Sequence, residues 1–212
     1  MPPAFSAIAP VWLGTIPFAE GLEIQDELVA QRFAAEIPDT LLLLEHEPVY
    51  TIGRRRDQSS LRNQENLPHP VVQTNRGGQA TYHGPGQLVG YFITNLNVRG
   101  RDLHAHLRSI EDLLTSFLNS LDVPATRREK LTGTWVADRK IASIGVGVRR
   151  WITMHGFALN ISDEPLAAFS HITPCGIQDV TMTSLHREAP SRTDLDVPAA
   201  AAHLVNHLTA AP

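Results

Sequence analysis

The feature that most restricts the fold is a glycine-rich run from Arg76 to Tyr91, RGGQATYHGPGQLVGY. Glycines at 77, 78, 84 and 86 exclude a helix here, because glycine loses more conformational entropy than any other residue when a helix forms. The same glycines allow a close approach to a ligand, which the polar residues between them would orient. Neither the P-loop order GxxxxGK[ST] nor a GxGxxG between a strand and a helix occurs. The run therefore predicts a glycine-lined hairpin, either purely structural or part of a binding site.

Hydrophobic spacing predicts the elements on both sides of this run. Helical spacing covers 18–37 and 102–121, and an Ala- and Leu-rich helix is expected after Pro198. Strands are expected at 41–44, 49–52, 71–74, 88–96, 134–137, 141–148 and 151–161, with a polar surface loop from 57 to 70. Regular alternation of strands and helices is absent, which argues against a doubly wound parallel sheet. We therefore predict a mixed α/β fold, with helices packed on largely antiparallel or mixed sheets, forming one domain over residues 1–212.

Composition excludes several classes of protein. The chain has 212 residues, 42% hydrophobic and 19% charged, with a formal net charge of −4, which does not suit a general binder of nucleic acids or anionic membranes. Its single cysteine excludes an internal disulfide. The N-terminal MPPAFSAIAP does not resemble a signal peptide, and no apolar run approaches the roughly 18 residues of a membrane span. We therefore expect a cytoplasmic protein. Its basic clusters, at 54–56, at Arg127, Arg128 and Lys130, and at 149–150, are either solvated surface or a dock for an acidic partner.

Cys175 and Lys140 are the candidate catalytic residues. A lone cysteine is often a small buried hydrophobe, but Pro174 and Gly176 place this one on an expected turn, which would expose its thiol. Lys140 is one of only two lysines in an arginine-rich set of cations, and small residues follow it along the predicted strand. A lysine retained where arginine is otherwise favoured indicates a compact cation that can titrate.

The ten histidines do not predict a metal site. No Cys-x-x-Cys or His-Glu-x-x-His pattern occurs, and His104 and His106 face different sides of the predicted helix. We expect no metal and no other cofactor. His46, His155 and His171 are instead expected to make polar contacts in or near a pocket.

Three segments together resemble the signature blocks of the bacterial lipoyl(octanoyl) transferases. They are RGGQATYHGPGQLVGY, KIASIGVGVRRWITMHGFALNI and HITPCGIQD, which occur in the family's order. The resemblance extends from about Leu41 to Leu185. It implies the fold of the biotin and lipoate protein ligases, and an enzyme that moves an octanoyl group from acyl carrier protein to a lysine amine of a lipoyl domain. The implied acceptors are the E2 subunits of 2-oxoacid dehydrogenases and the glycine cleavage H protein.

The resemblance also implies residue roles. Cys175 would carry the acyl group as a thioester, and Lys140 would lower the pKa of the thiol and handle protons. The implied substrate-contacting residues are Arg76, Gly77, Gly78, Gln79, Ala80, Thr81, Tyr82, His83, Ser143, Ile144, Gly145, Gly156, Phe157 and Ala158.

Three other functions remain as alternatives. An ATP-dependent lipoate or biotin ligase of the same fold would use an acyl-adenylate and would not need the Pro-Cys-Gly turn. A hydrolase would pass through the same thioester and admit water. A protein that binds lipoyl domains without catalysis would have no use for both Cys175 and Lys140.

Overall fold

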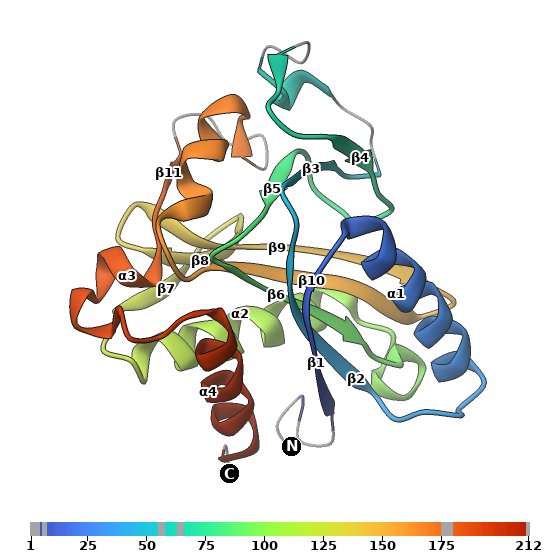
Figure 1. The fold of residues 1–212 in the computed structure, drawn as a ribbon. Helices are drawn as coiled ribbons and strands as arrows, with labels where there is room; N and C mark the ends of the chain where they lie inside the picture. Colours follow the sequence, from blue (N-terminus) through green and yellow to red (C-terminus); the bar gives the residue numbers. More distant parts are fainter. Residues whose placement is uncertain (1–4, 6–7, 55–57, 63–65, 175–179, 211–212) are drawn as a thin grey trace.

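The computed structural model describes residues 5, 8–54, 58–62, 66–174 and 180–210. Within them, an eight-stranded sheet runs in the order β1-β2-β6-β10-β9-β8-β7, and β11 pairs with β9 (Figure 1). Its strands are β1 (Ala9–Ile16), β2 (Thr40–His46), β6 (Gln87–Ile93), β7 (Ala125–Arg128), β8 (Leu131–Val136), β9 (Arg139–Arg149), β10 (Ile152–Asn160) and β11 (Thr181–Met182). A second sheet has the order β4-β3-β5, from β3 (Val49–Ile52), β4 (Val71–Gln73) and β5 (Thr81–His83).

Helices cover both faces of the larger sheet (Figure 1). The α-helices are α1 (Phe18–Phe33), α2 (Leu103–Asn119), α3 (Leu185–Glu188) and α4 (Val197–Ala210), and the 3-10 helices are η1 (Gln58–Ser60), η3 (Leu96–Arg99), η4 (Glu164–His171) and η6 (Pro190–Arg192). Alternate residues of each central strand face opposite sides of the sheet, so one face packs on α2 and α4 and the other on α1. The smaller sheet stands on the α1 side and has its own core around Tyr50 and Tyr82. No helix in the described part of the chain is long and apolar enough to cross a bilayer.

The predicted fold class is confirmed, because mixed sheets with packed helices are what the structure contains. Among the strands of the described residues, only β1–β2, β3–β4 and β9–β11 are parallel pairs. The first helix ends at Phe33, four residues earlier than the spacing predicted, and Ala35 takes a positive φ of 61°. Strand β1 was missed because Pro10 and Gly14 interrupt it, which is tolerated at the edge of a sheet.

Candidate active site

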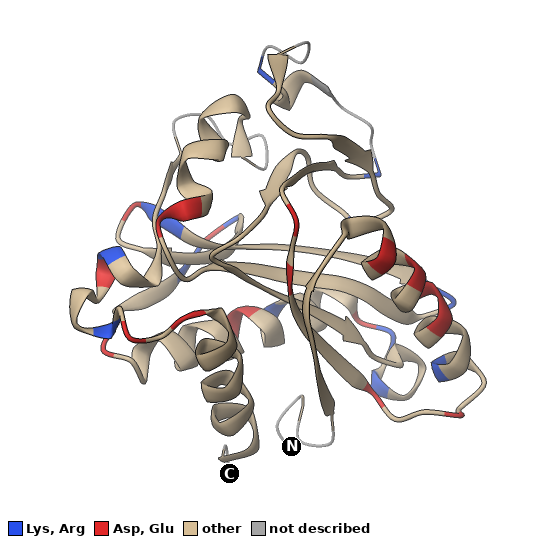
Figure 2. Ribbon diagram, in the orientation of Figure 1, with Lys and Arg blue, Asp and Glu red and all other residues tan. Residues whose placement is uncertain are grey.

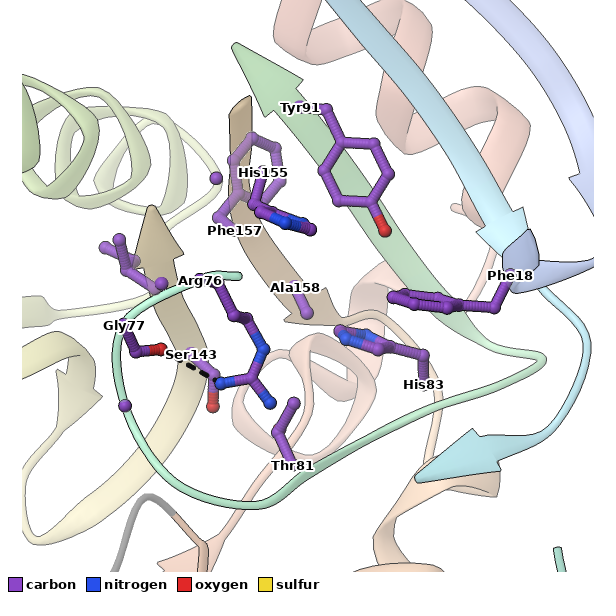
Figure 3. Close-up of a pocket in the computed structure, with 14 residues that line it drawn as sticks. Phe18, Arg76, Gly77, Thr81, His83, Tyr91, Ser143, His155, Phe157 and Ala158 are labelled. Carbon is purple, nitrogen blue, oxygen red and sulfur yellow. Dashed lines mark hydrogen bonds between the residues drawn. The ribbon is translucent and has the colours of Figure 1, made fainter. Parts of the chain in front are cut away.

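The glycine-rich segment folds over the middle of β9 and β10, and a small cavity lies between the segment and these strands (Figure 3). The cavity has a volume of about 40 Å³. Its walls come from α1, β5, β6, β9, β10 and the segment before β5. They are formed by Phe18, Arg76, Gly77, Gly78, Thr81, His83, Tyr91, Ser143, Ile144, Gly145, His155, Gly156, Phe157 and Ala158.

The floor of this cavity is bare backbone because glycines face each other across the strands. Gly145 on β9 is the cross-strand partner of Gly156 on β10. A Cβ at Gly156 would lie 2.3 Å from the carbonyl oxygen of Gly90, and one at Gly145 would lie 3.1 Å from that of Gly77. The missing side chains let the glycine-rich segment descend onto β9, where the Gly77 amide donates to Val146 O at 3.0 Å. The glycines therefore set the depth of the cavity.

Arg76 holds the glycine-rich segment in shape. Its guanidinium is buried and donates to the carbonyl oxygens of Gly77, Gln79 and Thr51, and to the Thr51 hydroxyl, over 2.7 to 3.0 Å. Figure 3 shows the Gly77 contact. Because these bonds close the loop on itself and tie it to β3, Arg76 contributes to the site by shaping its wall and by adding a buried positive charge.

Three buried imidazoles surround the closed end of the cavity. Burial lowers the pKa of His46 to about 4 and that of His155 to about 3, and it takes the pKa of His83 well below its usual range. His46 Nδ1 lies 3.0 Å from Ile16 O, so it donates there, and its Nε2 accepts from the Tyr91 hydroxyl at 2.7 Å. Burial also raises the pKa of Tyr91. At neutral pH these three imidazoles are therefore polar but uncharged.

Two hydroxyls in the wall are buried and lack a hydrogen-bond partner among the described residues. They are Thr81 Oγ1 and Ser143 Oγ, with residue exposures of 5% and 7%. Buried polar atoms are almost always paired in folded proteins. The pair therefore marks the position in the cavity wall where a polar group of a ligand would be stabilised.

Lys140 is fully buried on β9, three residues before Ser143. Its Nζ lies 5.5 Å from the centre of the Trp135 ring, and its side chain leaves no room for a Cβ at Gly133, which would be 2.6 Å from Lys140 Cε. The Thr183 amide donates to Lys140 O at 2.9 Å and so fixes the strand from its other side. Lys140 does not line the 40 Å³ cavity. Cys175 lies outside the described residues, so its predicted position stays a prediction.

Most of the predicted contact residues meet in one place. Gln79, Ala80 and Tyr82 are the exceptions, because they belong to the glycine-rich segment but do not line the cavity, and Ala80 and Tyr82 lie in the core of the smaller sheet. His155 was expected near the pocket and lines it, and His46 packs against the wall residue His83. His171 has an exposed side chain in η4 and is not part of the wall.

Phe18 and Tyr91 are wall residues that were not predicted as contacts. Tyr91 ends the glycine-rich run, so the run itself carried the signal. Phe18 opens α1, and its ring stacks on His83 with a centroid separation of 5.9 Å, which no local pattern indicates. No cluster of three or more metal-ligating side chains occurs in the described part of the chain.

A wider groove adjoins the cavity along the edge of β9. Its volume is about 400 Å³, and it shares Gly77, Gly78, Ile144 and Gly145 with the cavity. The remaining walls combine two cations with aliphatic side chains from α2, β8 and β9. They are Arg54, Asn75, Leu103, Leu107, Lys130, Leu131, Thr132, Val146, Gly147 and Val148.

The arginines at the β9–β10 turn have partners within the protein. Arg149 pairs with Asp26 at 3.1 Å on α1, where acidic residues gather (Figure 2). Arg150 lies over the ring of Phe33 at 4.9 Å. These contacts occupy both side chains at the end of the hairpin.

Solved structures of other proteins share this fold. Solved structures with the same fold include a bipartite lipoate protein ligase from Thermoplasma acidophilum, with a TM-score of 0.70 and 15% identity, covering 95% of this chain and 82% of that one. Another is biotin protein ligase from Aquifex aeolicus in complex with biotin and ATP, with a TM-score of 0.54 and 12% identity over 95% and 68% of the two chains. The architecture is therefore that of lipoate and biotin protein ligases.

Sequence comparison gives the family. The lipoyl protein ligase A/B catalytic domain model matches residues 17–209. The octanoyltransferase of Geobacter sulfurreducens is 53% identical over 84% of this chain and 74% of its own length, and that of Syntrophotalea carbinolica is 50% identical over 82% and 81%. The chain belongs to this family, among relatives named octanoyltransferase.

Proposed function

We propose that this protein transfers an octanoyl group from acyl carrier protein to the lysine amine of a lipoyl domain, as a step of lipoate biosynthesis. The observation that carries the proposal is a slot under the glycine-rich segment, lined by glycines, apolar side chains and neutral imidazoles, three residues along β9 from a buried lysine. Three residues of strand span about 10 Å. Relatives at about 50% identity that are named octanoyltransferase support the choice of acyl group.

The slot suits an aliphatic chain with one polar end. Phe18, Ala158 and the glycine floor offer apolar contacts, His83 and His155 are neutral, and the guanidinium of Arg76 is bonded to backbone carbonyls of its own loop and of Thr51. The hydroxyls of Thr81 and Ser143 would donate to the thioester carbonyl, which supplies the partner that they otherwise lack. A 40 Å³ cavity holds only about three water molecules, so the acyl chain must displace wall side chains or the glycine-rich segment as it enters.

The proposed reaction has two steps with Cys175 as the nucleophile. In the first, the Cys175 thiolate attacks the octanoyl carbonyl, a new C–S bond forms, the bond between the carbonyl carbon and the carrier sulfur breaks, and the departing thiolate takes a proton from Lys140, which is left neutral. In the second, the acceptor amine attacks the same carbonyl, an amide forms, and the Cys175 thiolate leaves. Thioester exchange is nearly isoenergetic and amide formation is downhill, so the proposal includes no ATP.

Lys140 is proposed to act on protons in both steps. Only a few per cent of an ordinary cysteine with a pKa near 8.5 is thiolate at pH 7, and a cation within about 4–6 Å favours the thiolate. As the amine attacks, it must lose a proton, which Lys140 accepts once it is neutral. Arginine would keep the charge but cannot release its proton at accessible pH. Lys140→Arg should therefore be nearly as inactive as Lys140→Ala.

The groove beside the cavity offers a path for the donor. Arg54 and Lys130 flank it, which suits an acidic carrier whose prosthetic arm bears a phosphate. The E2 subunits of 2-oxoacid dehydrogenases and the glycine cleavage H protein are the proposed acceptors.

Intact-mass measurement tests the central step. After incubation with octanoyl carrier protein and without acceptor, the wild-type protein should gain one octanoyl group, and adding a lipoyl domain should remove it. Cys175→Ala should gain none and transfer none. Transfer by Cys175→Ala at the wild-type rate would reject the thioester. A requirement for ATP with free octanoate would instead favour the ligase alternative.

A further inference from the structure

A chain of buried amide side chains connects the wall of the cavity to the strand that carries Lys140. His83 Nδ1 lies 2.9 Å from Gln87 Oε1, Gln87 Nε2 lies 2.9 Å from Asn160 Oδ1, and Asn160 Nδ2 lies 2.9 Å from Thr183 O. Gln87 and Asn160 are direct cross-strand partners on β6 and β10, and each is 1% exposed. We call these two residues the amide relay.

The direction of each hydrogen bond in the amide relay follows from the backbone carbonyl of Thr183, to which Asn160 is bonded. The Thr183 carbonyl can only accept, so Asn160 must present its NH₂ group there and its oxygen to Gln87. Gln87 must then present its own NH₂ to Asn160 and its oxygen to His83. His83 therefore carries its proton on Nδ1. One backbone carbonyl thus determines the tautomer of an imidazole in the cavity wall.

The same carbonyl belongs to a residue that holds Lys140. The Thr183 amide donates to Lys140 O, and the Thr183 hydroxyl donates to Glu188 Oε1 at 2.6 Å. Arg139 also donates to Glu188, from Nε to Oε1 at 2.7 Å and from Nη2 to Oε2 at 2.8 Å. Arg139 and Lys140 on β9 are therefore both linked to Thr183, Lys140 directly and Arg139 through Glu188. The amide relay connects Thr183 to the cavity.

We propose that Gln87 and Asn160 are positioning residues, which fix the Nδ1–H tautomer of His83 in the cavity wall and hold the backbone at Lys140 in register with the bound acyl group. The inference rests on the proposed role of Lys140 in transfer. With its proton on Nδ1, His83 offers Nε2 as a hydrogen-bond acceptor only. The network needs two amides because each must donate on one side and accept on the other, which neither a carboxylate nor an aliphatic side chain does.

The first test is the tautomer of His83, measured from its imidazole ¹⁵N shifts in labelled protein and assigned with His83→Gln. The wild-type protein should show the Nδ1–H form. In Asn160→Leu the relay is broken and this preference should be lost. An Nε2–H form in the wild-type protein would overturn the proposal.

The second test separates positioning from stability. Asn160→Asp keeps the shape but removes the donor to Thr183 O, so kcat should fall about tenfold or more while KM for a small octanoyl thioester changes by less than about threefold. Thr153→Val is the matched control, because Thr153 is equally buried on β10 and loses bonds to Phe92 O and Thr94 N. It should lower stability and leave kcat unchanged. Equal kcat in Asn160→Asp and wild type would overturn the positioning role.

The two levels of proposal fail in different ways. If the wild-type protein did not transfer the octanoyl group, the proposed function would fall, whereas the tautomer measurement needs no catalysis. If the thioester forms on Cys175 but Asn160→Asp and Asn160→Leu both turn over at the wild-type rate, only the relay is wrong.

Discussion

Mild acid should unfold this protein through its buried histidines. Burial lowers the pKa of His46 and His106 to about 4 and that of His155 to about 3, whereas each imidazole has a pKa near 6.5 in the unfolded chain. Between these values the unfolded chain binds protons that the folded protein does not. The stability is therefore fully present above about pH 6.5 and is lost as the pH falls toward 4. His83 contributes in the same direction.

The size of the effect follows from proton linkage. Between pH 7.5 and 5.5, each of the three imidazoles with a stated pKa lowers the free energy of unfolding by about 1.3 kcal/mol, or about 4 kcal/mol together. Domains are usually stable by only about 5–15 kcal/mol, so much of the stability is at risk. The stability contributed by the carboxylates with lowered pKa, Asp163 and Glu188, is lost only nearer pH 4. These carboxylates therefore do not account for a change in stability between pH 7.5 and 5.5.

Urea unfolding at fixed ionic strength, followed by tryptophan fluorescence at several pH values, measures this directly. Near pH 5.5 the slope of the unfolding free energy against pH should correspond to an uptake of about three to four protons, about 0.9 from each of His46, His83, His106 and His155. His106 packs on Phe5 and Phe92 away from the cavity, so His106→Leu should remove about one proton from that slope. His104→Asn, at an exposed site on the same helix, is the control. A wild-type slope of one proton or less would refute the reasoning.

Three further outcomes are expected. Gly133→Ala should lower transfer, because its Cβ would lie 2.6 Å from Lys140 Cε at a φ of 133°, and a steady-state assay at equal folded protein checks this. Tyr91→Phe should cost about 1–3 kcal/mol in thermal or urea unfolding, because it leaves buried His46 Nε2 without its donor. Asp39→Asn should cost about 3 kcal/mol and leave kcat unchanged, because this buried carboxylate joins two arginines far from the cavity; unchanged stability would contradict it.

Local pattern was sufficient for the long helix and for the long central strands. The helix from Leu103 to Asn119 follows its hydrophobic spacing closely, and β9 and β10 lie where strands were predicted although both are buried along almost their whole length. Strand β1 was not predicted, because an edge strand tolerates the proline and glycine that would exclude a central strand. Strand β7 was not predicted either, because its sequence ATRR has no apolar alternation and it forms by pairing with β8.

The site was predictable to the extent that its residues share a segment. The glycine-rich run and the segments that form β9 and β10 contain most of the residues of the cavity wall, and these were predicted. Phe18 reaches the wall by packing, and the bonds joining Gln87, Asn160 and Thr183 span distant parts of the chain. Such contacts follow from the pairing of strands and leave no periodic trace in the sequence.

The bare floor of the cavity has a consequence for how the acyl specificity of this fold can change. At Gly145 and Gly156 no smaller residue exists, so substitutions there can only shorten the space above the sheet. Longer or bulkier acyl groups must instead be admitted by trimming the aromatic side chains around the cavity, at Phe18 or Tyr91. Evolution and engineering therefore have two separate routes, because the glycine positions can only reduce the length of the chain that fits, whereas the aromatic positions can increase it.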